Sequence, residues 1–187
     1  MLVDPRTERT RQSVLAAAAE LLADRGFERV TIDGLAERSG VARSTIYRNW
    51  PERAQLLAQA FAVMCPHHAE VDEGSLEADL RLIGTTLARG LADEDWGRAL
   101  PSLIAAADHD ADLREASVAF TGERRAALRS VLARAQERGE IRSGADLDQA
   151  VRRFSAPFFY ARLISREPLD EAFVEAQVAD ALGVLGV

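Results

Sequence analysis

The amino-acid sequence predicts an all-α protein of about nine helices, and three features of its pattern support this. Apolar residues recur three and four positions apart along most of the 187 residues, which is the spacing of one helix face. No run of alternating β-branched residues, which would indicate a half-buried strand, interrupts this pattern. Particular glycines stand where one apolar stripe ends and the next begins, namely Gly26, Gly40, Gly139 and Gly144.

Four helices are expected in the first third of the chain. Gly26 can end the first of them, and Thr31 is a suitable N-cap for the second. The second and third are short, and they are separated by Gly40, where the chain needs a positive φ. Pro51 suits the turn before the fourth. The expected helices span Thr7–Arg25, Ile32–Ser39, Arg43–Trp50 and Glu52–Met64.

Five further helices are expected after an acidic linker, Val71–Ser75. Gly139 and Gly144 follow the third of these, and Pro157 lies inside the fourth, where its missing amide should kink the helix. The kink either shapes a cavity or is purely structural. The expected helices span Leu76–Ala92, Trp96–Asp108, Asp112–Arg138, Leu147–Ser165 and Asp170–Leu185.

Charge divides the chain between an N-terminal module, residues 1–53, and a C-terminal domain, residues 65–187, with the helix at about 52–64 as a connector. The 23 basic residues, all of them Arg, face 30 acidic ones, which gives a net charge of −7. Residues 1–53 contain 9 Arg and 8 acidic residues, so most of the excess acidity lies farther along the chain. This balance excludes a protein that coats nucleic acid or anionic membrane through its overall charge. Any contact with nucleic acid must therefore be local.

Several classes of site have no support in the sequence. A single cysteine, Cys65, excludes a disulfide framework and multi-cysteine zinc sites, and a packing role is expected for it. His67, His68 and His109 stand in expected turns and helix ends, so no metal site is predicted. Because phosphate loops and nucleophile elbows do not occur, we expect neither an enzyme nor a cofactor. A cytoplasmic protein away from the membrane is expected, because neither a secretory signal nor an apolar run of about 20 residues is found.

Two short helices joined by a glycine turn have the layout of a helix-turn-helix, whose second helix enters the major groove of DNA. In the second helix, Ile46 and Trp50 are four positions apart and should face the core. The side chains left on the outside are of the types that bind bases and phosphates. They are Arg43, Ser44, Thr45, Tyr47 and Arg48. From the residues alone, a solubilising surface with Tyr47 partly packed remains the alternative.

The segment from residue 30 to 57 reads VTIDGLAERSGVARSTIYRNWPERAQLL. Its Thr31, Leu35, Ala36, Gly40, Val41, Thr45, Ile46, Tyr47, Trp50, Leu56 and Leu57 resemble, in order and spacing, the N-terminal domain of the TetR family of transcriptional regulators. The preceding helix fits the first helix of that family, so the resemblance covers about residues 10–60. The departures are Ser39, Asn49, Trp50 and Arg53, which stand where Ala, His, Phe and Lys are usual.

The resemblance implies DNA contacts for individual residues. Thr31, Tyr47, Asn49 and Arg53 would hold the phosphate backbone of double-stranded operator DNA, whereas Arg43, Ser44, Thr45 and Arg48 would face base edges or adjacent phosphates. Three further arginines of the N-terminal arm either add contacts or belong to a frayed terminus. These are Arg6, Arg9 and Arg11.

The C-terminal part, by the same resemblance, is a ligand-binding and dimerisation domain made of a helical bundle. Apolar residues cover more of the penultimate helix than one buried face requires, so a second face can contact another subunit. The expected dimer interface comprises Phe159, Leu163, Phe173, Val174, Gln177, Val178, Ala181 and Leu182. Such a homodimer would present two recognition helices to a palindromic operator.

Candidates for a ligand pocket are apolar residues on helices expected to enclose the centre of the bundle. They are Trp96, Leu100, Leu103, Ile104, Phe120, Phe154 and Phe158, and plain core packing is the alternative for each. Such a lining favours a hydrophobic small-molecule effector. The predicted function is a ligand-responsive transcriptional regulator, a repressor released from its operator by that molecule. The alternative is a helical small-molecule-binding or adaptor protein that keeps the fold without regulating DNA.

Overall fold

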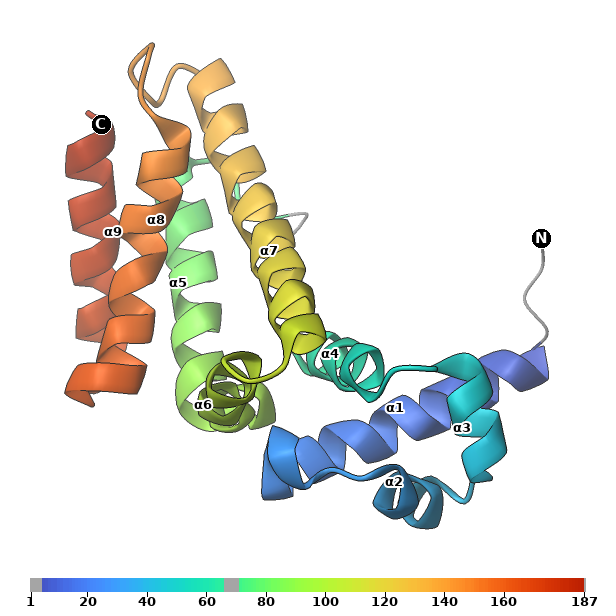
Figure 1. Ribbon diagram of the computed structural model, residues 1–187. Helices are drawn as coiled ribbons and strands as arrows, with labels where there is room; N and C mark the ends of the chain where they lie inside the picture. The colour runs from blue at the N-terminus through green and yellow to red at the C-terminus, as the bar shows by residue number, and fades with distance from the viewer. Residues whose placement is uncertain (1–4, 66–70, 187) are drawn as a thin grey trace. The chain divides into compact units, whose positions relative to one another are not determined.

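The computed structural model describes residues 5–65 and 71–186, and within these residues the chain forms nine α-helices, two short helical turns and no strand (Figure 1). The predicted all-α fold is thus confirmed. The elements are α1 Pro5–Arg25, η1 Phe27–Arg29, α2 Ile32–Ser39, α3 Arg43–Asn49, α4 Arg53–Met64, α5 Leu76–Asp93, α6 Asp95–Ala107, α7 Ala111–Glu137, α8 Leu147–Tyr160, η2 Ala161–Ser165 and α9 Glu171–Leu185.

The predicted helix ends agree with the observed ones within two residues, except in the penultimate helix. The predicted helix Leu147–Ser165 is α8 followed by η2, a π-helical turn. Pro157 precedes this wide turn by one helical turn, and the amide of Ala161 reaches the carbonyls of both Phe158 and Pro157. Proline cannot donate a hydrogen bond to the preceding turn, and its ring crowds the carbonyl four residues back. The backbone remains α-helical through Pro157 to Tyr160, and it departs from α-helical hydrogen bonding at Ala161.

The chain folds into two compact units that interleave along the sequence. The first comprises residues 1–66 and 95–120, and the second comprises residues 67–94 and 121–187. The first unit thus combines the N-terminal helices with α6 and the beginning of α7. A single boundary in the sequence does not describe this arrangement, because α6 returns to the N-terminal helices after α5 has joined the second unit.

In the first unit, α1 packs against α2, α4 and α6. Gly26 ends α1 with a φ of 74°, and the amide of Phe27 donates to Ser102 Oγ of α6 over 3.2 Å. Burying one large apolar side chain contributes about 1.5–3 kcal/mol, so the short helices α2 and α3 depend on this shared core for their stability. Large side chains buried in this core include Leu22, Phe27, Leu35, Ile46, Trp50, Leu56 and Leu57.

In the second unit, α5, α8 and α9 lie side by side (Figure 1). Their core contains Phe154 and Phe158, whose ring centroids are 5.6 Å apart, and Phe173 packs edge-on against Phe158 at 5.2 Å. Val174 and Val178 of α9 are buried in the same core. The inner face of α9 is therefore apolar, and it belongs to the protomer's own core.

Hydrogen bonds from distant residues hold the start of α5. Glu140 accepts the amide hydrogen of Leu76 over 2.6 Å, and this bond holds the pKa of the Glu140 carboxyl below its ordinary value. Asp79 is completely buried, accepts from the amide of Glu73 over 2.6 Å and lies 3.4 Å from a guanidinium nitrogen of Arg138. A buried carboxylate needs such partners, so these contacts tie the start of α5 to the segment that follows α7.

A Gly84→Leu exchange is expected to lower the free energy of unfolding by about 1–3 kcal/mol, because it overpacks the junction of α5, α8 and α9. A β-carbon at this position would lie 3.0 Å from Val174 Cγ1 and 3.4 Å from the rings of Phe154 and Phe158. Urea denaturation measures the change. The control is Gly122→Ala in α7, where no described atom lies within 4 Å of the added carbon and a gain of about 0.5–1 kcal/mol is expected. Destabilisation by both exchanges would contradict the packing argument.

Candidate functional site

The turn between α2 and α3 has the geometry of a helix-turn-helix. Gly40 adopts a left-handed conformation, with φ 70° and ψ 11°, and its amide donates to the carbonyl of Ala36 over 3.0 Å. The hydroxyl of Ser39 donates to the carbonyl of Leu35 and accepts from the amide of Val41. These bonds use the backbone groups that a helix end leaves open. The positive φ predicted at Gly40 is confirmed.

Thr31 caps the N-terminus of α2, as its place in the sequence predicts. Its Oγ1 accepts the amide hydrogen of Gly34 over 3.1 Å, and the side chain is exposed. A threonine hydroxyl can donate one hydrogen bond while it accepts another, so the cap leaves the hydroxyl hydrogen available.

Trp50 anchors the end of α3 to α1 and α4. Its side chain is buried, and its Nε1 donates to Gln59 Oε1 of α4 over 2.9 Å. Arg11 of α1 donates to the same oxygen over 2.6 Å, and its guanidinium carbon lies 5.4 Å from the centre of the indole ring. Arg11 is therefore a structural residue of the first unit. Gln59 was not singled out in the sequence, because nothing in its local pattern pairs it with an indole.

The outer face of α3 carries the predicted recognition residues. Arg43, Ser44 and Arg48 are exposed, Thr45 is half-buried, and Tyr47 has an exposed fraction of 52%. This exposure favours a binding residue over the packed tyrosine of the alternative interpretation.

Arg43 contacts its neighbouring helix through a weak ion pair. Its Nε lies 3.0 Å from Asp33 Oδ1 of α2, and both side chains are more than half exposed. An exposed ion pair of this kind contributes about 0–1 kcal/mol, so the guanidinium can exchange Asp33 for another partner at little cost.

Asn49 and Arg53 direct some of their donors to the protein. Asn49 Nδ2 donates one hydrogen to the carbonyl of Thr45 over 2.8 Å. The second hydrogen of this amide group can be donated to another acceptor. Arg53 Nε donates to the carbonyl of Val30 over 2.7 Å, and Nη2 of Arg53 donates to the carbonyl of Phe27. Through Nε and Nη2, Arg53 thus holds the start of α4 to the segment between α1 and α2.

A polar cleft of about 210 Å³ lies between the start of α1 and the end of α3. Arg6, Thr7 and Thr10 line it from α1, and Arg48 and Asn49 line it from α3. The sequence alone leaves the role of Arg6 open and does not single out either threonine. Because α1 begins at Pro5, Thr7 and Thr10 lie three positions apart on one helix face, and this spacing was the available signal.

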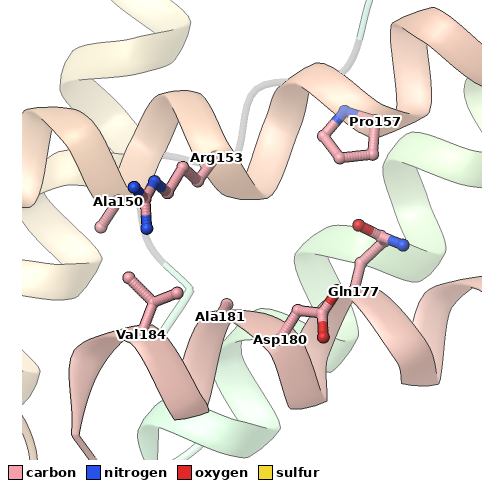
Figure 2. A pocket seen from close by; sticks show the side chains of 7 residues that line it. All are labelled: Ala150, Arg153, Pro157, Gln177, Asp180, Ala181 and Val184. Atoms are coloured by element: carbon pink, nitrogen blue, oxygen red, sulfur yellow. The ribbon is translucent and has the colours of Figure 1, made fainter.

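A second hollow, a groove of about 240 Å³, lies between α8 and α9. Figure 2 shows the seven side chains that line it from the two helices. They are Ala150, Arg153, Pro157, Gln177, Asp180, Ala181 and Val184. Neither Arg153 nor Asp180 forms an ion pair with any residue that the structure describes.

The predicted dimer residues fall into three groups. Gln177 and Ala181 line the groove, whereas Val174 and Val178 are only 3% and 2% exposed and lie in the protomer's core instead. The others, Phe159, Leu163, Phe173 and Leu182, are half-buried. Arg153 and Asp180 are not among the predicted residues, because the sequence prediction rests on apolar side chains. Helical spacing identifies both residues. Residues 150, 153 and 157 form one stripe along α8, and residues 177, 180, 181 and 184 form one stripe along α9.

The predicted ligand residues are divided between the two units. Phe154 and Phe158 pack together in the second unit, whereas Trp96, Leu100, Leu103, Ile104 and Phe120 belong to the first. Phe120 packs on Phe61 with ring centroids 5.4 Å apart. Trp96 and Leu103 are buried, but Ile104 is 47% exposed and does not belong to the core of its unit.

In the part of the chain that the structure describes, no cluster of three or more His, Cys, Asp or Glu residues could hold a metal ion. His109 is exposed, and the predictions for His67 and His68 concern residues outside the described ranges. None of the helices in residues 5–65 and 71–186 is both long and apolar enough to span a bilayer.

Two family profiles match the chain. The profile described as "Bacterial regulatory proteins, tetR family" matches residues 14–60, which include α2 and α3. The profile described as "Tetracyclin repressor-like, C-terminal domain" matches residues 70–181.

Individual relatives resemble the chain over nearly its whole length. It is 32% identical to the DNA-binding transcriptional repressor TetR of Mycobacteroides abscessus, over 96% of this chain and 95% of that protein. It is also 32% identical to the uncharacterized HTH-type transcriptional regulator YdeS of Bacillus subtilis, over 95% of this chain and 90% of that protein. The crystal structure of the TetR family transcription regulator SCO0332 aligns with a TM-score of 0.77 and 33% identity, covering 94% and 97% of the two chains.

Proposed function

This chain belongs to the TetR family of bacterial transcriptional regulators, and from that premise we propose that it is a repressor that binds a palindromic operator as a homodimer. In this proposal it acts in the cytoplasm, catalyses no reaction and leaves the DNA when a small apolar molecule binds. The observation that carries the proposal is the outer face of α3, where Arg43, Ser44, Tyr47 and Arg48 are exposed directly after the turn at Gly40.

The proposed phosphate contacts use donors that the fold leaves open. Thr31 would donate its hydroxyl hydrogen, Tyr47 its phenol and Asn49 its second amide hydrogen. Arg53 would add positive charge at the start of α4 with the part of its guanidinium that does not hold the carbonyls. Arg43, Ser44, Thr45 and Arg48 are the proposed contacts to base edges or adjacent phosphates. Among them Arg43, the first residue of α3, suits a guanine edge best.

A second copy of the chain is the proposed occupant of the groove between α8 and α9. The groove combines apolar walls with one positive and one negative side chain, Arg153 and Asp180, that have no ion-pair partner among the described residues. Covering an unpaired charge is unfavourable, so a partner surface must supply the opposite charge. A two-fold axis does this with identical chains, because each groove then offers Asp180 to the other's Arg153.

We place the effector in the C-terminal domain, residues 65–187, with residues 1–53 as the DNA-binding domain and α4 as the connector. Phe154 and Phe158, which pack together in the second unit, are the candidate contacts that lie within one unit, and their chemistry favours a hydrophobic ligand. The effector needs only to favour a conformation in which the two α3 helices no longer match successive major grooves. A coupling of about 1–3 kcal/mol would weaken operator binding about 5- to 150-fold.

A mobility-shift experiment with the DNA that lies directly upstream of the protein's own gene tests the proposal. We expect retardation at low salt that excess unrelated DNA does not abolish. A helical small-molecule carrier with the same fold would leave the DNA unretarded, and that result would overturn the proposal.

A further inference from the structure

The cleft between α1 and α3 is strongly basic. Two guanidinium groups line it, Arg6 from the first turn of α1 and Arg48 from α3, and none of the described residues that line it is acidic. The remaining lining side chains, Thr7, Thr10 and Asn49, are polar and neutral. This composition suits an anion with several oxygen acceptors.

The position of the cleft along α3 separates it from the residues that read bases. The first residues of a recognition helix contact base edges, and Arg43 is the first residue of α3. Arg48 and Asn49 are the sixth and seventh of its seven residues, at the end where the chain turns to α4. A ligand held there by both helices would lie beside the recognition helix, where the sugar-phosphate backbone of a bound duplex runs.

We propose that this cleft grips one phosphodiester of the DNA backbone in each half-site, with Arg6 and Arg48 as its two cationic walls. Thr7 adds a hydroxyl donor, whereas Thr10 donates its hydroxyl to the carbonyl of Arg6 over 3.0 Å and so holds the first turn of α1 in shape. In this arrangement Arg48 positions α3 in the groove and does not read a base. The inference rests on the proposed function, because its ligand is DNA.

The test is the salt dependence of DNA binding by the Arg6→Ala, Arg48→Ala double variant and by each single variant. Each phosphate contact contributes about −0.9 to the slope of log K against log salt. Losing one contact per protomer should make the slope of the dimer less steep by about 1.8. Affinity should fall by the same factor for operator and for unrelated DNA, so the specificity ratio stays constant. Arg48→Lys should keep most of the slope, because an ammonium group also neutralises a phosphate.

Arg25→Ala is the matched control, because it removes the same charge from the other end of α1, about 28 Å away at 1.5 Å per residue. It should leave the slope unchanged. Thermal unfolding of each variant is measured alongside, and if the double variant unfolds early, the single and lysine variants provide the slopes.

Three results would overturn the proposal. An unchanged slope in the variants would mean that the cleft holds no phosphate of the DNA. A loss confined to the operator would mean that Arg48 reads a base. Stabilisation of the wild type by inorganic phosphate, lost in the double variant while the DNA slope stays the same, would mean that the cleft takes a free anion. If the wild type bound no DNA at all, the proposed function itself would fail, which is a distinguishable outcome.

Discussion

Replacing Arg43 and Tyr47 together with alanine is expected to abolish specific operator binding while the protein remains folded and dimeric. A bidentate arginine contact with guanine contributes about 1–3 kcal/mol, and the dimer loses two of them. Arg43 alone thus accounts for about 2–6 kcal/mol, or at least about thirtyfold in the dissociation constant. Tyr47 is 52% exposed and Arg43 has only its exposed pair with Asp33, so little stability should be lost. Titration of labelled operator, compared with unrelated DNA, measures the effect.

Single variants assign the contributions. Tyr47→Phe keeps the ring and removes the phenol, so it should weaken operator and unrelated DNA alike if the hydroxyl binds a phosphate. Arg43→Ala should reduce the preference for operator. The control is Arg25→Ala, which removes the same charge at the far end of α1 and should leave both affinities unchanged. Full operator binding by the Arg43, Tyr47 double variant would refute the assignment of α3 as the recognition helix.

Reversing the charge of Arg153 is expected to convert the dimer into monomers. The Arg153→Asp exchange adds a second carboxylate to a groove that already contains Asp180. Breaking a buried charge pair at an interface costs about 2–5 kcal/mol, and a two-fold axis repeats the loss. The dimer dissociation constant should therefore rise at least thirtyfold per pair. Sedimentation measures the monomer fraction, and operator affinity should fall with it, because a monomer holds one half-site.

The reciprocal exchange makes this test specific. Asp180→Arg alone should also dissociate the dimer, whereas combining it with Arg153→Asp restores opposite charges across the two-fold axis and should recover dimers. Arg152→Asp is the control, because Arg152 is the exposed neighbour of Arg153 and does not line the groove. If Arg153→Asp stayed dimeric, or if Arg152→Asp dissociated the dimer equally, the groove would not be the interface.

Local features of the fold could be predicted because their causes are local. Helix ends follow from capping residues and terminators, such as Thr31 and Gly40, whose geometry depends on a few neighbouring residues. Periodicity likewise identified the buried Ile46 and Trp50. The π-helical turn after Pro157 was missed, since a proline signals an irregularity without specifying its form.

Features that depend on long-range packing could not be predicted in the same way. Arg53 directs two donors to carbonyls more than twenty residues earlier in the chain. Arg11 of α1 and Trp50, at the end of α3, both donate to Gln59 Oε1 of α4. The apolar residues of α9 all suited a dimer interface by composition. The packing of α9 against α5 and α8 determines that Val174 and Val178 face inward. The positions of the helices can thus be predicted from the sequence more reliably than the directions in which their side chains point.

The central claim is that a homodimer presents two α3 helices to one palindromic operator. Selection of bound sequences from a random DNA library, followed by sequencing and by measuring the protein-to-DNA ratio of the complex, tests it most directly. We predict an inverted repeat whose half-sites are centred about 10 base pairs or a multiple apart, with an even number of protomers on each site. An unrepeated site bound by one protomer, or no enrichment of any sequence, would contradict the claim.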